Sequence, residues 1–316
     1  MKKNILYLIT FFTVISINHE LLSQNRNIEI TYKRNSDKSV DISYTKKLPG
    51  SYFVKLEFTT LTNCLESSIE RVIKSSSGRL VKLNPTNSKE NINFSYKYYT
   101  IRGIPNPKAD SLFNYTLPLM EGNNVKIHEA SNFGEQYFGS KKPTNWKSYI
   151  VYRNNSDTIY SMRKGIVVAI TNKYVADTIF KKGYTSKKNT IIIEHSDGTY
   201  ASYSGFKKNS IFVKLSQTVY PQTKLGLLEI FNTGKYRLDF SISYLIDNNI
   251  ENQEKQNLKN RKSKYAYLTP YFLTENGFEK LKHCKKYTVT SNEKTLFKEF
   301  TKRERKKYKK NPQTFK

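Results

Sequence analysis

The chain has 316 residues, which is enough for two domains of ordinary size. Hydrophobic residues make up 37% of the sequence and aromatic residues 14%, and this content excludes a chain that stays disordered for want of a core. The formal net charge of +28 indicates anionic neighbours, although a compositional bias towards Lys, Asn, Ile and Tyr explains the charge equally well.

Residues 1–24 have the pattern of a secretory signal peptide. Lys2 and Lys3 form a basic start, and an apolar run follows from Ile5 to Ile17. This run is too short and wrongly flanked for a stable span, and no later stretch is apolar enough to cross a bilayer. The alternatives are an uncleaved anchor or a buried strand. We therefore expect an exported protein that is periplasmic, outer-envelope associated or extracellular, with no transmembrane span after the signal peptide.

Residues 25–120 contain short segments in which apolar and polar side chains alternate, bounded by Gly, Pro, Asn or Ser. Such alternation with regular turn signals predicts an antiparallel β-sandwich. Residues 64–74 are ambiguous between helix and strand. The region has no carboxylate pair, His cluster or Gly-rich phosphate loop, so we expect a scaffold or a partner-binding surface. The alternating segments are 27–33, 39–45, 51–60 and 91–100.

Residues 121–250 predict a second all-β domain with little helix. Asp197 and Gly198 form a DG pair, which is a strong signal for a tight hairpin turn. The expected strands on either side of this turn and beyond it are 165–170, 189–195, 199–206, 210–216, 223–230 and 237–245.

Three segments follow the second domain. Residues 251–264 are polar and charged, which is typical of a linker or long surface loop. Residues 265–300 form a β-rich C-terminal extension, with strands expected at 265–273 and 285–291. Residues 301–316 are a basic tail, which we expect to be solvated and frayed; a dedicated anchor is the alternative.

The two cysteines, Cys64 and Cys284, lie far apart in the sequence. In an oxidising compartment they can form a disulfide bond between the N-terminal and C-terminal regions, and two buried free thiols are the alternative. Neither cysteine has the spacing of a metal site. Cys284 follows His283 directly, and no other residue nearby in the sequence completes a set of four ligands.

Five partial motifs in residues 115–245 occur in a fixed order. They resemble those of the LytM/lysostaphin-type zinc metalloendopeptidases, which cut peptidoglycan cross-links and share the duplicated hybrid motif. The resemblance implies a LytM-like antiparallel β-sheet domain within residues 121–250. The motifs are YTLPLMEG (115–122), TIYSMRKGIVVAI (158–170), NTIIIEHSDGTYASYSGF (189–206), FVKLSQTVYPQTKLG (212–226) and RLDFSIS (237–243).

The resemblance also implies what is missing. In the family, two His and one Asp hold a zinc ion whose fourth position binds water, and two further His assist the reaction. The family's Asp falls on Ile150, the two assisting His on Gly205 and Arg237, and one ligand His on Asp239; the other ligand His has no counterpart. None of the five positions keeps its residue. We therefore expect a degenerate site with no metal, no cofactor and no enzyme activity.

Two residues of this region are candidate ligand-binding groups. Arg237 places a permanent positive charge where the metal would be, and its donor fork suits a carboxylate. The alternative is an ion pair between Arg237 and Asp239 that only stabilises the fold. His195 falls on a family position that is structural, so a hydrogen-bonded structural histidine is the favoured interpretation there.

Three functions are consistent with the sequence. The leading hypothesis is an exported pseudo-enzyme that binds peptidoglycan or another anionic envelope polymer, or that regulates an envelope protein. The alternatives are an active zinc cell-wall endopeptidase with relocated ligands, and a structural or adhesive envelope protein. Nucleic acid is not an expected partner, because the exported chain lacks a recognisable nucleic-acid-binding fold.

Overall fold

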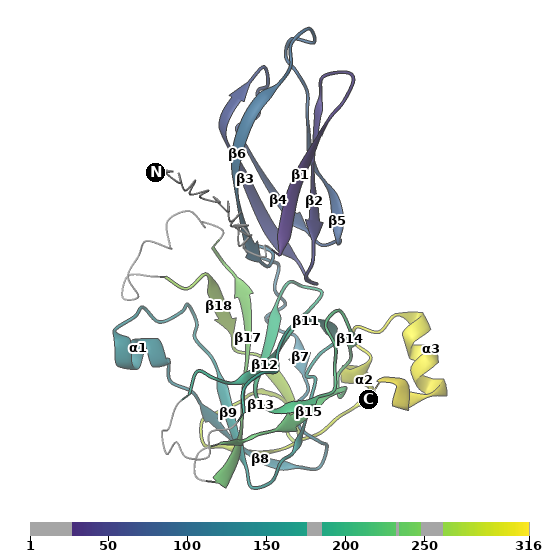
Figure 1. Cartoon of the computed structure of the whole chain (residues 1–316). Helices are drawn as coiled ribbons and strands as arrows, with labels where there is room; N and C mark the ends of the chain where they lie inside the picture. Colours follow the sequence, from purple (N-terminus) through teal and green to yellow (C-terminus); the bar gives the residue numbers. More distant parts are fainter. Residues whose placement is uncertain (1–26, 176–184, 232–233, 248–261, 316) are drawn as a thin grey trace, which may run out of the picture.

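The computed structural model is built mainly from β-strands, so the expected all-β fold class is confirmed (Figure 1). The expected signal peptide and most of the expected linker lie outside the described residues. Within the described part of the chain, no helix is long and apolar enough to cross a membrane. The structure describes residues 27–175, 185–231, 234–247 and 262–315.

The N-terminal part is a sandwich of two three-stranded antiparallel sheets, with strand orders β1-β2-β5 and β4-β3-β6. Alternate residues of β2 (Val40, Ile42 and Tyr44) are buried between the sheets, as the alternating pattern predicts. The ambiguous segment 64–74 contains a strand, β4. The strands are β1 (Ile28–Arg34), β2 (Val40–Lys46), β3 (Tyr52–Thr62), β4 (Ser68–Ile73), β5 (Ser77–Leu83) and β6 (Asn93–Arg102).

The second part is a large, strongly bent antiparallel sheet whose main path runs β14-β11-β12-β13-β17-β9-β8-β21. Strands β10, β15, β16 and β18 pair at its sides. The bounds along the main path are β14 (Thr218–Val219), β11 (Gly165–Thr171), β12 (Asn189–Glu194), β13 (Tyr200–Ile211), β17 (Lys235–Leu245), β9 (Tyr149–Arg153), β8 (Asn124–Glu129) and β21 (Lys286–Thr288). The side strands are β10 (Thr158–Tyr160), β15 (Lys224–Leu228), β16 (Ile230–Phe231) and β18 (Tyr265–Leu268).

Most strands of the large sheet lie where the sequence places them, and the DG turn connects β12 to β13 with Gly198 at a φ of +82°. The segments 199–206 and 210–216 differ, because β13 runs through both as far as Ile211. A register irregularity between Phe206 and Ile211 lets this long strand bend and pair with β15 as well as β17.

The C-terminal extension packs back on the start of the domain. The expected strand 265–273 is interrupted at Thr269 and Pro270 and forms β18 and β19 (Tyr271–Thr274). Strand β19 pairs with β20 (Gly277–Lys280) and, in parallel, with β7 (Asn114–Tyr115). The extension and the segment that enters the domain therefore share one small sheet.

The sandwich and the large sheet meet at a hydrogen-bonded junction. The backbone N–H of Ser51 donates to the buried carboxylate of Glu194 (2.8 Å), and the hydroxyl of Tyr265 donates to the carbonyl of Arg102 (2.7 Å). Gly50 has a φ of +89°, and a Cβ there would lie 2.5 Å from the Glu194 carboxylate. Only glycine fits this close approach.

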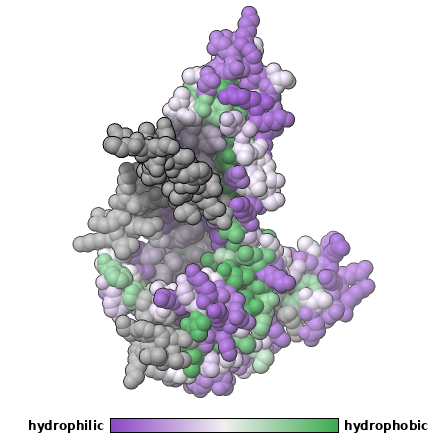
Figure 2. Space-filling model, in the orientation of Figure 1, coloured by the Kyte–Doolittle hydropathy of each residue, from purple (hydrophilic) through white to green (hydrophobic). Residues whose placement is uncertain are grey.

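The expectation of a frayed basic tail is wrong. The tail forms α3 (Lys302–Lys310), whose start is fixed by a capping box between Thr301 and Glu304. Figure 2 shows the outer surface of this helix as hydrophilic. The tail is ordered because its inner side packs against apolar residues at and after the end of helix α2 (Glu293–Leu296) and against Tyr220, in a separate cluster. Its members are Phe297, Phe300, Phe315, Tyr220, Leu296 and Tyr308.

Buried ion pairs attach this C-terminal segment to the large sheet. Arg163, 2% exposed, donates to Glu299 (2.8 Å) and Asp197 (2.8 Å), and its guanidinium lies 3.6 Å from the centre of the Phe113 ring. Burial acts to raise the pKa of Asp197, but the charge of Arg163 and nearby hydrogen bonds outweigh it and lower the pKa to about 2.

Both cysteines are free, so no disulfide bond joins Cys64 to Cys284. Cys64 is half-buried against the sandwich core, beyond the end of β3 that lies away from the junction. Cys284 is exposed, next to β21 in the other part of the molecule. The expectation of two buried thiols is therefore wrong for Cys284.

Candidate functional site

The four positions that the sequence resemblance assigns to the family's site lie together on three neighbouring strands. Asp239 on β17 is opposite Ile150 on β9 and opposite Ser204 on β13. Gly205 directly follows Ser204, and Arg237 is two residues before Asp239 on the same face of β17. We call Ile150, Gly205, Arg237 and Asp239 the substituted row. The fold thus brings together the residues on which the motif resemblance places the family's functional positions.

The carboxylate of Asp239 is shared by two cations. The Nε of Arg237 donates to Oδ1 (3.0 Å), the Nη2 of Arg237 donates to the same oxygen, and the Nζ of Lys188 donates to Oδ2 (2.7 Å). The three side chains are only 12–17% exposed. The ring of Phe231 lies 4.9 Å from the Arg237 guanidinium and 5.4 Å from the Lys188 ammonium. The group is a closed, half-buried cluster of ion pairs.

Lys188 was not among the residues that the sequence singled out. It lies 51 residues before Asp239 and is one of 54 Lys and Arg residues, so no local signal marks it. Burial acts first to lower the pKa of Lys188, and Arg237 lowers it further. Asp239 opposes both effects, and the net result is a lowered pKa. The carboxylate therefore counteracts the effect of burial and favours the charged form of this ammonium group.

The substituted row does not fit a zinc ion. Zinc sites use thiolate, imidazole and carboxylate ligands, but the only such group in the row is the carboxylate of Asp239. Two cations already hold that carboxylate, and they repel a dication at short range. Ile150 offers no ligand atom. The side chains of the row support a structural ion-pair cluster, which is the alternative role of Arg237.

The backbone at Gly205 leaves no room for a side chain. Its φ is +114°, and a Cβ at this position would lie 2.1 Å from the carbonyl oxygen of Arg237. Real Cβ atoms do not come this close to backbone oxygen. A histidine therefore cannot be placed at 205 without moving β13 or β17.

His195 is almost fully buried, with only 2% of its surface exposed, which favours the structural interpretation. Its Nδ1 donates to the carbonyl of Lys164 (2.8 Å), which leaves Nε2 as a buried acceptor without a partner in the described structure. Burial, followed by the charge of Arg163, lowers the pKa of His195 to about 4. The imidazole is therefore neutral at ordinary pH.

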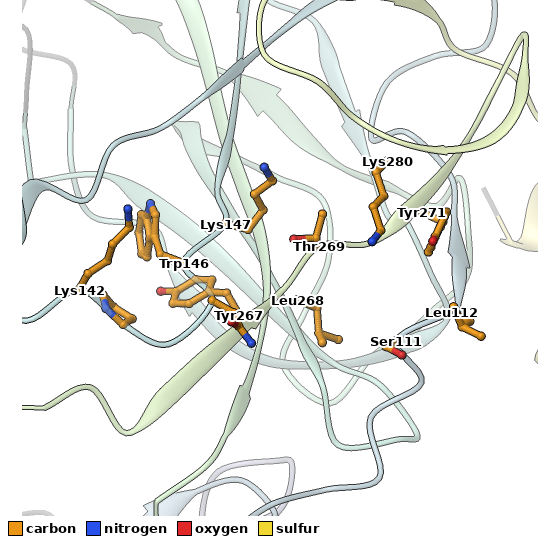
Figure 3. Close-up of a pocket in the computed structure, with 12 residues that line it drawn as sticks. Ser111, Leu112, Lys142, Trp146, Lys147, Tyr267, Leu268, Thr269, Tyr271 and Lys280 are labelled. Atoms are coloured by element: carbon orange, nitrogen blue, oxygen red, sulfur yellow. The ribbon is translucent and has the colours of Figure 1, made fainter.

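A pocket of about 560 Å³ lies apart from the substituted row (Figure 3). It is formed by the segment before β9, the β18–β19 connection and β20. Figure 3 shows Trp146 and Tyr267 side by side, and their rings are 4.6 Å apart in an edge-to-face arrangement. The lining residues are Ser111, Leu112, Lys142, Pro143, Asn145, Trp146, Lys147, Tyr267, Leu268, Thr269, Tyr271 and Lys280.

The chemistry of this pocket is aromatic and cationic. Three lining residues are lysines, and three are aromatic: Trp146, Tyr267 and Tyr271. Lys147 is paired with Glu129 (2.7 Å), whereas the ammonium of Lys280 lies over the ring of Tyr271 at 5.1 Å. Aromatic faces bind apolar ligand surfaces, and ammonium groups bind anions. The sequence offered one signal that we did not use: Trp146 is the only tryptophan of the chain.

Comparisons with known proteins add only weak similarities. No protein-family model matches the sequence, and no curated protein matches it. Among solved structures, a proposed M23 peptidase from Pseudomonas aeruginosa has a TM-score of 0.25 and 12% identity, over 60% of this chain and 82% of its own. A zinc-containing peptidase from Vibrio cholerae has a TM-score of 0.24 and 15% identity, over 68% of this chain and 74% of its own. Csd3 of Helicobacter pylori has a TM-score of 0.28 and 11% identity, over 92% of this chain and 79% of its own. These values are too low to assign the chain to a family.

Proposed function

We propose that this protein is an exported, catalytically inactive LytM-like protein that binds an anionic component of the cell envelope. The observation that carries the inactive part is the ion-pair cluster of Arg237, Asp239 and Lys188. It occupies the position where the sequence resemblance puts the zinc ion of an active enzyme. A carboxylate already held by two cations is a poor ligand for a third.

The pocket around Trp146 supports the binding part of the proposal. It combines aromatic rings with ammonium groups, which suits a ligand that has both apolar surface and carboxylates, such as a peptidoglycan stem peptide. The net charge of +28 favours the same class of partner over long distances. The proposed ligand site is therefore this pocket, and not the substituted row.

Co-sedimentation of the purified protein with peptidoglycan sacculi tests the binding. Lys280→Gln removes one charge inside the pocket, and Lys310→Gln removes one charge from α3, outside it. We expect Lys280→Gln to weaken binding roughly fivefold or more, since about 1 kcal/mol corresponds to that factor. We expect Lys310→Gln to bind like the parent protein.

The outcome separates pocket binding from a general attraction of a basic protein to an anionic polymer. If the two variants lose binding equally, and salt suppresses the binding of all forms, then net charge alone attracts the protein and the pocket has no role. Trp146→Ala provides a second, uncharged test of the pocket.

An active zinc endopeptidase with relocated ligands is the second candidate, because two histidines and a cysteine meet on the same face of the sheet as the substituted row. Release of soluble muropeptides from sacculi, in the presence and absence of added zinc, decides between the two functions. The inactive protein releases none in either condition.

A further inference from the structure

Three side chains that can bind a metal ion meet at one edge of the large sheet. His128 lies on β8, and His283 and Cys284 precede β21. Each offers a ligand atom, and these atoms all lie within 4.8 Å of one another. The Sγ of Cys284 is 3.9 Å from the Nδ1 of His128. His128 is half-buried, while the other two are exposed, so the group is open to solvent.

The backbone fixes this arrangement. Strand β21 pairs with β8, and the N–H of Cys284 donates to the carbonyl of Ile127 (2.7 Å). Cys284 has a φ of +60°, a conformation that residues other than glycine adopt infrequently. It turns the chain so that His283 and Cys284 both approach His128. The N–H of Glu129 donates to the Nδ1 of His283 (3.0 Å) and holds that ring beside the cluster.

We propose that His128, His283 and Cys284 form a binding site for one transition-metal dication of the zinc type. Imidazole nitrogen and thiolate sulfur are the ligands that this class of ion prefers, and three protein ligands leave a fourth position open to water or a partner group. In a tetrahedral zinc site with bonds of about 2.0 Å to nitrogen and about 2.3 Å to sulfur, the ligand atoms lie roughly 3.3–3.5 Å apart. The sulfur–nitrogen distance of 3.9 Å is already close to this range.

Metal binding needs one local rearrangement. The Nδ1 of His283 now accepts a hydrogen bond, which places the ring proton on Nε2. The ring must release Glu129, or turn over, to offer an unprotonated nitrogen.

The site lies on the strand next to Ile150 of the substituted row and two strands from Arg237 and Asp239, on the same face of the sheet. His128 is opposite Ile150, which is itself opposite Asp239, and cross-strand partners point to the same face. The ring of Tyr152 separates the two groups, 5.6 Å from the His128 ring and 5.8 Å from the Arg237 guanidinium. The proposed metal is therefore displaced from the position that the sequence resemblance gives for zinc. This inference stands independently of the proposed ligand pocket.

Metal titration of the whole protein tests the site. The protein is purified without a polyhistidine tag, reduced, and stripped with a chelator that is then removed. Zinc binding is measured by calorimetry. Cobalt(II), which replaces zinc in such sites, reports on the sulfur ligand through a thiolate-to-cobalt charge-transfer absorption. We expect one zinc ion per chain and a cobalt spectrum with this absorption.

Variants identify the ligands. We expect Cys284→Ser to abolish the charge-transfer absorption, and both Cys284→Ser and His128→Asn to weaken zinc binding at least tenfold. Cys64→Ser removes the other free thiol and is the matched control, which we expect to bind both metals like the parent. All variants are compared by thermal unfolding of the metal-free protein.

The proposal is overturned if Cys284→Ser binds zinc as tightly as the parent, or if Cys64→Ser loses the cobalt absorption. Binding to sacculi is measured in the same preparations with and without zinc. A metal site that leaves sacculus binding unchanged supports this inference whatever the fate of the proposed function.

Discussion

Two ion-pair clusters in the large-sheet domain have opposite compositions. At one, Arg163 is shared by two carboxylates, Asp197 and Glu299; at the other, the carboxylate of Asp239 is shared by Arg237 and Lys188. The first is nearly inaccessible, with an Arg163 side chain 3% exposed, whereas the second is 12–17% exposed. The first attaches the C-terminal segment, and the second fills the substituted row. Ion pairs thus attach a chain segment in one cluster and fill the space between strands in the other.

The strongest test of this comparison is Arg163→Met. It leaves two half-buried carboxylates without their buried cation, and we expect the free energy of unfolding to fall by roughly 3 kcal/mol. Urea unfolding measures the change. Arg79→Met is the control, because Arg79 pairs with Asp41 on the surface with a side chain 60% exposed, and should cost less than about 1 kcal/mol. Equal losses of unfolding free energy in the two variants would contradict the inference that burial makes the Arg163 cluster the more stabilising one.

Gly205→Ala tests the backbone of the substituted row. A methyl group there meets the Arg237 carbonyl at 2.1 Å, so we expect a loss of at least about 3 kcal/mol from the clash and the positive φ together. Gly277 also has a positive φ, but a Cβ there meets nothing within 4 Å. Gly277→Ala should therefore cost only the conformational part, about 1–2 kcal/mol. Similar values in the two variants would show that β13 and β17 adjust freely.

The pH dependence of stability probes the neighbourhood of the Arg163 cluster. The pKa of His195 is about 4 in the folded protein and near 6.5 when unfolded, so the unfolded chain binds the extra proton between these values. Stability is therefore full above about pH 6.5 and falls by roughly 3 kcal/mol as the pH drops to 4. His195→Gln should lack this step in urea unfolding. A step of unchanged size in the variant would assign it to other groups.

A second loss follows at lower pH and comes from carboxylates. The pKa values of Asp197 and Glu304 are both about 2, below the value of roughly 4 for an unfolded chain. Their stabilising effect is present above pH 4 and disappears as the pH falls towards 2. We expect the tail to detach in this range, and NMR signals of Tyr220 and Tyr308 in the aromatic cluster can follow it. The parent and His195→Gln should behave alike here.

Asp239→Asn gives the smallest expected effect. It leaves Arg237 and Lys188 facing each other without a carboxylate, at a site that solvent partly reaches. We expect a loss of about 1–2 kcal/mol in urea unfolding. Glu57→Gln, in a more exposed pair with Lys55, should change stability by less than about 0.5 kcal/mol. A loss from Asp239→Asn as large as that from Arg163→Met would mean that the two clusters contribute equally to stability.

Strands such as β2, β12 and β17 could be predicted from the sequence because each is a local pattern, whereas β8 and β9 were not among the expected strands. In β2 the buried and exposed residues alternate as the side chains do along any strand, and the DG turn before β13 follows from glycine's access to positive φ. The order of the tail could not be predicted, because its many charges outweigh its two aromatic residues in the pattern. Tyr308 and Phe315 determine its structure through contacts with aromatic rings outside the tail, including Phe300.

The side-chain clusters could not be predicted, because strand pairing alone decides which distant residues meet. Lys188 reaches Asp239 across 51 residues, and Cys284 reaches His128 across 156. The sequence showed His283 and Cys284 as neighbours without further ligands, and only the pairing of β21 with β8 supplies His128. The residue types at Ile150, Gly205, Arg237 and Asp239 can be read from the sequence alone, because they depend on no contact between distant residues.

The late position of β19 and β21 in the sequence affects how the chain folds during synthesis. Strand β7 pairs with β19, and β8 with β21, in each case with partners about 160 residues further along the chain. A nascent chain therefore carries unpaired strand edges until almost its whole length has been made, and such long-range pairing is intrinsically slow. Truncation before residue 286 leaves β8 as an open edge, so shortened products are expected to aggregate and to be degraded rather than to accumulate as folded fragments.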